Sequence, residues 1–205
     1  MHNLPFNTVS LAADDVQALE DAYNALKAKF KIGLPDSKSP INKFELFNNG
    51  QAESVSGTLL LNSPATDCYL SFVKVRSQFT AGRTHLDYLK CQAWAFVDLK
   101  HDFGRVLIRR ETFTDKVLQL VNHIELKFKD DKVFSSNFYV VTNDAGKANA
   151  AITQGFRDVI KDNMYSNFVI EIIGNILVIR NSQPVDTEQT VNLAEFACKI
   201  AALGD

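Results

Sequence analysis

Two stretches, CYLSFVKVRS (68–77) and LDYLKCQAWAFVDL (86–99), decide the fold of this chain. Apolar and polar residues follow a period of two in both, and β-branched and aromatic residues are abundant, which is typical of β-strands. The segment FTAGRTH (79–85) between them contains a glycine suited to a turn. We therefore expect two consecutive strands of an antiparallel sheet.

Strand-like runs continue on both sides of this pair. FVIEIIGNILVIRN (168–181) predicts a hairpin that turns at Gly174-Asn175, since glycine and asparagine tolerate the backbone angles of tight turns. The other predicted strands are SVSGTLLLN (54–62), GRVLIRRE (104–111), IELKFKD (124–130) and FYVVT (138–142).

Apolar residues at steps of three and four predict four helices. The expected ranges are about 10–30, 114–122, 144–162 and 187–203. Asp186 or Thr187 is suited to cap the last of them, because a short polar side chain can accept from the free N–H groups of the first turn.

Consecutive strands with helices at both ends and one inserted indicate an α+β fold. We expect a largely antiparallel sheet packed by the N-terminal, inserted and C-terminal helices. Residues 1–205 fit one domain, in which 35–54 forms a loop or hinge held to the body by Phe44, Leu46 and Phe47. The 15 Phe predict a Phe-rich core, with a Phe-lined groove as the alternative.

The overall composition excludes several classes of protein. A formal net charge of -2 and scattered basic residues disfavour nucleic-acid binding. No stretch approaches the roughly 18 apolar residues of a membrane span, and the N-terminus does not resemble a secretory signal. Each of Cys68, Cys91 and Cys198 lies in an apolar pattern, which predicts buried free thiols and a cytoplasmic protein.

Two short motifs resemble parts of nucleotide-binding sites, but each lacks residues that such a site requires. Gly146-Lys147 follows a strand and precedes a helix, but Val141 stands where a phosphate loop needs glycine, and Ala148 replaces its Ser or Thr. Asn143 or Asp144 is instead expected to cap the helix. The triplet Asp102-Phe103-Gly104 lacks every other kinase motif and is suited to a reverse turn.

No cofactor or metal site is predicted, because the four His lack the spacing of zinc ligands. One acid–base site is conceivable across the predicted sheet. His85 and Asp87 would share a strand face, with His101 and Arg109 nearby, although such residues are more often ordinary cross-strand partners. We assign no catalytic residue.

The second half of the chain resembles a known family. The similarity covers about residues 95–182 and rests on Phe96–Leu99, Phe103-Gly104, Val106, Glu125-Leu126, Phe134, Phe138–Val140, Asp144, Ala148, Ile152, Phe156, Ile160, Ile170–Ile172, Gly174-Asn175 and Leu177–Ile179. This pattern is similar to an uncharacterised bacterial family in which two membrane helices usually precede a soluble domain, and whose members are sometimes mislabelled galanin. The resemblance implies a bacterial α+β domain without known catalytic residues.

Two hypotheses of function follow. The first is a non-enzymatic binding or scaffolding domain that contacts a protein partner, or a second copy of itself, through a Phe-rich surface or a strand edge. The second is a small-molecule enzyme built on His85, Asp87, His101 and Arg109. A deep pocket lined by those four side chains would favour the enzyme, and a shallow surface with exposed Phe would favour the binder.

Overall fold

The computed structural model describes residues 4–35, 40–48, 52–62, 68–81, 84–110 and 124–203. Within them, nine strands form one antiparallel sheet in the order β1-β2-β3-β4-β9-β8-β5-β7-β6. The strands are β1 (Lys31–Gly33), β2 (Ala52–Asn62), β3 (Cys68–Ala81), β4 (Thr84–Asp98), β5 (Arg105–Arg110), β6 (Ile124–Leu126), β7 (Phe138–Thr142), β8 (Phe168–Ile173) and β9 (Ile176–Asn181). The predicted α+β class is confirmed.

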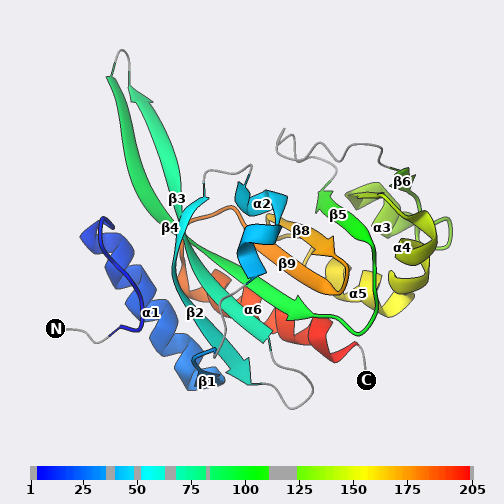
Figure 1. Cartoon of the computed structure of the whole chain (residues 1–205), viewed down its shortest axis with the longest axis horizontal. Coiled ribbons are helices and arrows are strands. Elements are labelled where there is room, and N and C mark those ends of the chain that lie inside the picture. The colour runs from blue at the N-terminus through cyan, green and yellow to red at the C-terminus, as the bar shows by residue number, and fades with distance from the viewer. Residues whose placement is uncertain are drawn as a thin grey trace.

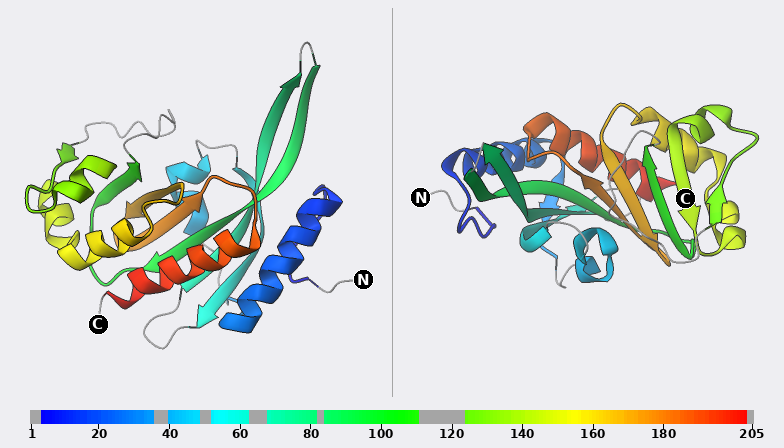
Figure 2. Two further views of the ribbon diagram at one scale, coloured as in Figure 1. Left: turned by 180° about the vertical axis from the view of Figure 1, so that it is seen from behind. Right: turned by 90° about the horizontal axis from the view of Figure 1, so that it is seen from above.

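The helices lie on both sides of the sheet (Figures 1 and 2). They are α1 (Ala13–Lys29), the 3-10 helix η1 (Pro40–Lys43), α2 (Glu45–Asn48), α3 (Lys132–Asn137), α4 (Ala145–Ala151), α5 (Gln154–Asp162) and α6 (Thr187–Ala202). The right-hand view of Figure 2 places α1, α5 and α6 over one face and the short η1–α2 segment over the other. We call these the helix-packed face and the α2-covered face.

The helix-packed face holds the larger of two apolar cores. Helix α6 contributes Leu193, Phe196, Ala197 and Ile200, each at most 6% exposed, at the steps of three and four that the sequence predicted. Asp186 caps this helix, as predicted, by accepting from the N–H of Gln189 at 3.0 Å. An isolated helix of this length is marginal in water, so its apolar stripe is what holds it on the sheet.

The α2-covered face is organised around Glu171, a carboxylate that is only 2% exposed. Its oxygens accept from the N–H of Leu46 at 2.9 Å and of Glu45 at 3.2 Å, and from the guanidinium of Arg105 at 3.0 Å. The buried rings of Phe44 and Trp94 fill the core beside this group. Within the segment predicted as a loop held by its aromatic residues, residues 40–43 and 45–48 are thus helical and are attached through a buried charge on β8.

Removing the charge of Glu171 should loosen this attachment. Glu171→Gln keeps the size of the side chain but turns an NH₂ group toward the N–H donors of α2, so we expect a loss of about 1.5–3 kcal/mol in unfolding free energy. Urea denaturation measures the loss, and hydrogen exchange at Leu46 localises it. Glu125→Gln, on the exposed strand β6, is the matched control. Equal stability of the two variants would contradict the assigned role.

Several local predictions were wrong. The helix expected over 144–162 is divided, because Thr153 caps a new helix, α5, by accepting from the N–H of Phe156 at 3.3 Å. The strand expected over 124–130 ends at Leu126 and is followed by α3, which the sequence analysis missed. The helix expected over 114–122 lies outside the described residues.

Other predictions are confirmed. Asp144 caps α4 by accepting from the N–H of Lys147 at 3.0 Å, so the Gly146-Lys147 turn is a helix start. The hairpin turns at Gly174, whose φ of 63° belongs to the left-handed region. The three cysteines form no disulfide with one another; burial is confirmed for Cys68 and Cys91, whereas Cys198 is partly exposed, contrary to the prediction.

A buried ion cluster joins α5 to α3. Arg157 is 4% exposed, and its guanidinium contacts Asp130 at 2.5 Å, Asp131 at 3.4 Å and the ring of Phe128 at 4.6 Å. Lys161 approaches the same Asp131 carboxylate at 2.7 Å. Each buried charge in the cluster has partners of opposite sign. We therefore assign the cluster a structural role.

The cluster predicts a specific acid dependence of stability. Burial acts to raise the pKa of Asp131, but hydrogen bonds from Lys161, the Phe134 N–H and Gln154 outweigh it and lower the pKa from 3.8 to about 2. With the folded-state pKa below the unfolded one, the stabilisation is complete above the unfolded value and is lost as the pH falls through about 2. The difference is worth roughly 2–3 kcal/mol.

We therefore expect Asp131→Asn to flatten the acid limb of the stability curve. Urea unfolding of both proteins, measured from about pH 5 down to about pH 2, compares the two slopes. The wild-type chain should lose more unfolding free energy over this range than the variant. Parallel curves would show that Asp131 is not the group responsible.

Candidate ligand-binding site

The structure does not bring the four candidate acid–base residues together. Asp87 lies near the start of β4 and His101 follows its end, and at about 3.3 Å per residue the strand between them spans roughly 35 Å. The backbone of His85 pairs with that of Thr80, near the tip of the β3–β4 hairpin. Asp87 follows two residues later on the same strand.

Arg109 is separate from the other three. It lies on β5. Its cross-strand neighbours, one strand after another, are Val169 on β8, Arg180 on β9 and Trp94 on β4, so Arg109 is three strands away from β4. Side-chain alternation puts Arg109 on the α2-covered face with Trp94, whereas Asp87 falls on the opposite face of β4. Its guanidinium stacks on Tyr139 at 4.6 Å. The predicted acid–base constellation therefore has no common site.

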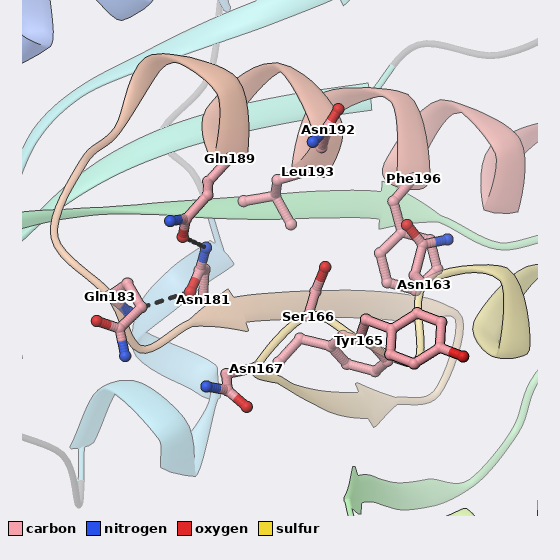
Figure 3. A pocket seen from close by; sticks show the side chains of 11 residues that line it. Asn163, Tyr165, Ser166, Asn167, Asn181, Gln183, Gln189, Asn192, Leu193 and Phe196 are labelled. Carbon is pink, nitrogen blue, oxygen red and sulfur yellow. Dashed lines mark hydrogen bonds between the residues drawn. The ribbon is translucent and has the colours of Figure 1, made fainter.

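A pocket of about 290 Å³ opens between α6 and one end of the β8–β9 hairpin (Figure 3). The loop after α5, the end of β9 and the first turns of α6 supply its polar walls, and apolar side chains from β8 and α6 supply its floor. We call it the amide pocket, because its lining consists of Asn163, Asn167, Asn181, Asn192, Gln183 and Gln189, with Tyr165, Ser166, Phe168, Leu193 and Phe196.

Hydrogen bonds among the amides hold part of this wall in place. Asn181 donates to Gln189 at 3.2 Å and accepts from the N–H of Gln183 at 3.0 Å, which joins the end of β9 to α6. Asn163 donates to the carbonyl of Val159 at 2.9 Å. Asn167 and Asn192 are exposed at the opening. The wall thus combines amides that are already oriented with amides available to a ligand.

The floor of the pocket is apolar. Phe168 is 2% exposed and Phe196 is 3% exposed, and their ring centroids lie 5.1 Å apart. Tyr165, at the edge, is 91% exposed (Figure 3). An aromatic ring that remains in water offers a ligand a flat apolar surface and a hydroxyl group.

The lining determines what the pocket can do chemically. An amide donates through nitrogen and accepts through oxygen, yet it neither ionises nor transfers a proton near neutral pH. Charged ligands are best held by opposite charges, and none of the lining residues carries one. A wholly apolar ligand would leave the amides without partners. The pocket suits a neutral ligand with several donors and acceptors.

A wider groove of about 640 Å³ lies between the start of α1 and the projecting β3–β4 hairpin. Three of its four charged lining residues already interact, since Arg76 contacts Glu53 and lies 4.0 Å from Asp87. A ligand there would have to break these contacts. We therefore place the candidate site at the amide pocket.

The described residues contain no cluster of three or more His, Cys, Asp or Glu side chains arranged to hold a metal ion. Among the same residues, no helix has both the length and the apolar character needed to cross a membrane.

Comparison with known proteins gives a likeness of fold. The crystal structure of the mycobacterial trehalose monomycolate transport factor A, TtfA, superposes with a TM-score of 0.57 and covers 91% of this chain and 93% of that one. The two sequences are 9% identical, so the likeness shows the fold alone. No protein-family model and no curated protein sequence matches the chain.

Sequence reasoning missed the amide pocket. It predicted the helix over 187–203 from its apolar steps, and in the structure Leu193 and Phe196 of that helix are buried while Asn192 is exposed. The signal in the sequence was a concentration of Asn and Gln in three short segments, 163–167, 181–183 and 189–192. Only the fold brings these segments to one place.

Proposed function

We propose that this chain is a non-enzymatic binding domain and that the amide pocket takes a neutral polyhydroxylated ligand, such as a hexose ring. The observation that carries the proposal is the lining itself, in which six amide side chains surround an apolar floor. Each sugar hydroxyl both donates and accepts, as each amide does. The C–H face of a pyranose ring would lie against the exposed ring of Tyr165, above the largely buried Phe168 and Phe196.

The size of the pocket fits one small ligand. Sites for drug-sized molecules occupy roughly 300–1,000 Å³, and the amide pocket, at about 290 Å³, lies at the lower end. At about −0.3 kcal/mol for each of roughly 12 heavy atoms, a hexose would bind with a Kd of about a millimolar. Weak reversible binding of this kind suits a carrier, sensor or scaffold.

Isothermal titration and ligand-observed NMR test this proposal. The probes are glucose, galactose, maltose and trehalose, the last because the structural neighbour is a trehalose monomycolate transport factor. Asn192→Ala removes one exposed amide from the opening and should weaken binding about 3- to 10-fold. Asn24→Ala makes the same change at an exposed position of α1 and should leave binding unchanged.

Two results would overturn the proposal. One is the absence of binding by all four sugars at about 50 mM, far above the expected Kd. The other is binding that Asn192→Ala and Asn24→Ala reduce equally. Adenosine is a useful further probe, because amides and an exposed Tyr also suit a nucleobase. Binding of adenosine in preference to sugars would assign the pocket to a different class of ligand.

A second role, contact with a protein through a strand edge, is favoured by the β3–β4 hairpin. Pairing with β2 stops at Val75 and pairing with β9 begins at Trp94, so among the described strands the outer hairpin is two-stranded (Figure 1). Such ribbons are marginally stable alone, and Tyr88 on this one is 40% exposed. Among the side chains whose exposure the structure describes, a set that leaves out 78–86, the exposed large apolar ones include no Phe, which favours a strand edge over a Phe-rich surface.

We expect a second copy of the chain to be the partner of this edge. Sedimentation should then show self-association that Tyr88→Lys weakens. The exposed Tyr165→Lys is the control for adding a charge elsewhere. A chain that sediments as a monomer at all concentrations would contradict pairing between copies.

A further inference from the structure

Two cysteines from distant parts of the sequence meet between β3 and α6. Cys68 is the first residue of β3 and Cys198 lies in the second half of α6. Their Sγ atoms are 3.0 Å apart. Cys68 is fully buried, whereas Cys198 is partly exposed.

The third cysteine occupies a different environment. Cys91 is 1% exposed, and burial, together with the nearby carboxylate of Asp15, raises the pKa of its thiol to about 12 against the opposing effect of Lys74. A thiol with so little thiolate is a poor nucleophile near neutral pH. Cys91 is therefore an internal reference for an unreactive cysteine.

We propose that Cys68 and Cys198 form a redox pair that closes into an intramolecular disulfide on reaction with a small disulfide such as oxidised glutathione. The S–S bond of a disulfide is about 2.05 Å long, so the two sulfurs need to approach by only about 1 Å. The inference rests on the two sulfur positions and is independent of the ligand proposed for the amide pocket.

The reaction has two exchange steps. The Cys198 thiolate attacks one sulfur of oxidised glutathione, forms a mixed disulfide and releases one glutathione thiolate, which takes up a proton. The Cys68 thiol then loses its proton, attacks the sulfur of Cys198 and expels the second glutathione. In total the two protein thiols lose two electrons and two protons, and one glutathione disulfide becomes two glutathione thiols.

The order of the steps follows from the surroundings of the two thiols. Cys198 is the cysteine that a solvent molecule can approach, and the hydrogen bond from Cys68 lowers its pKa, although burial and Glu195 act in the opposite direction. Both properties favour Cys198 as the attacking thiolate. Cys68, behind it, is positioned to resolve the mixed disulfide.

The disulfide would fix α6 to the start of β3. Its two cysteines are 130 positions apart, and a bridge across so long a loop restricts the unfolded chain strongly. Bridges of this kind commonly raise the melting temperature of a domain of this size by roughly 5–15 °C. The thermal transition is therefore a readout of closure that is separate from thiol chemistry.

The test uses the full chain, first reduced and then incubated with oxidised glutathione under native conditions. Intact mass should fall by about 2 Da, the two hydrogens lost in forming one disulfide. Peptide mapping should identify Cys68 linked to Cys198, with Cys91 still free, and the melting temperature should rise by several degrees. Cys91→Ala should close in the same way.

Cys198→Ser and Cys68→Ala separate the steps. Cys198→Ser should remain reduced under the same conditions. Cys68→Ala should stop at the mixed disulfide with glutathione on Cys198. Three outcomes would overturn the proposal: a wild-type chain that keeps three titratable thiols, a wild-type chain that stays glutathionylated at Cys198 without closing, or a disulfide that includes Cys91.

Discussion

Replacing Phe196 by Ala should lower the free energy of unfolding by about 3–5 kcal/mol, since it deletes a buried aromatic side chain and leaves a cavity. The ring is 3% exposed and packs against Phe168 in the apolar core between α6 and the sheet. A domain of ordinary stability has roughly 5–15 kcal/mol in total. The melting temperature should fall by roughly 6–20 °C.

Thermal and urea denaturation of Phe196→Ala measure this loss. Lys199→Ala is the matched control, because Lys199 lies on the exposed side of the same helix and surface changes alter stability by only about 0.5 kcal/mol. If Phe196→Ala melted cooperatively at the wild-type temperature, α6 would be an appendage, and its apolar stripe would be a surface for another partner.

Arg157→Met should be similarly costly, at about 3–5 kcal/mol, because it removes the central cation of a buried cluster. The variant keeps the apolar stem of the side chain but leaves Asp131, which is 6% exposed, with Lys161 as its remaining cation. It also loses the hydrogen bond to the Ile152 carbonyl at 3.0 Å. The link between α5 and α3 should weaken as a result.

Arg76→Met provides the comparison for this variant. Arg76 pairs with Glu53 at the surface, where its side chain is 55% exposed, and exposed ion pairs contribute about 0–1 kcal/mol. Urea denaturation of both variants at neutral pH measures the difference. Equal stability would mean that the Arg157 cluster behaves as a surface pair despite its burial.

The elements that were predicted correctly are those whose signal is local. The period of two along 68–99 and the Gly174-Asn175 turn each specify structure within a few residues. The structure contains the two predicted strands and the predicted hairpin. The break at Thr153 was missed because a continuous apolar stripe masked a capping residue. The short helix α3 offered too few residues for a periodic pattern.

The order of the strands and the amide pocket depend on contacts between distant segments. β9 inserts beside β4 although β5–β8 separate them in the chain. The pocket exists because Phe168 pairs with Asn181 while α6 crosses nearby, which brings three separate groups of amides together. Single polar residues on exposed loops and helix faces are ordinary, so nothing marked these amides as a site before the fold was known.

The same dependence explains why the candidate acid–base residues do not form a site. His85, Asp87, His101 and Arg109 were grouped on the expectation that neighbouring strands of the predicted sheet bring them together. The length of β4 separates the first two from His101, and the strand order places Arg109 three strands away. The resemblance of residues 95–182 to a bacterial family remains a prediction about ancestry and carries no site residues.

The central claim is that the amide pocket binds neutral polyhydroxylated ligands, and side-chain amide NMR tests it most directly. In a ¹⁵N-labelled chain, every Asn and Gln NH₂ group gives its own pair of signals. On titration with a hexose up to about 50 mM, well above the expected millimolar Kd, we predict saturable shifts for Asn167, Asn181, Gln189 and Asn192, with Asn24 unchanged. Signals that stay fixed throughout, or shifts confined to residues outside the pocket, would contradict the claim.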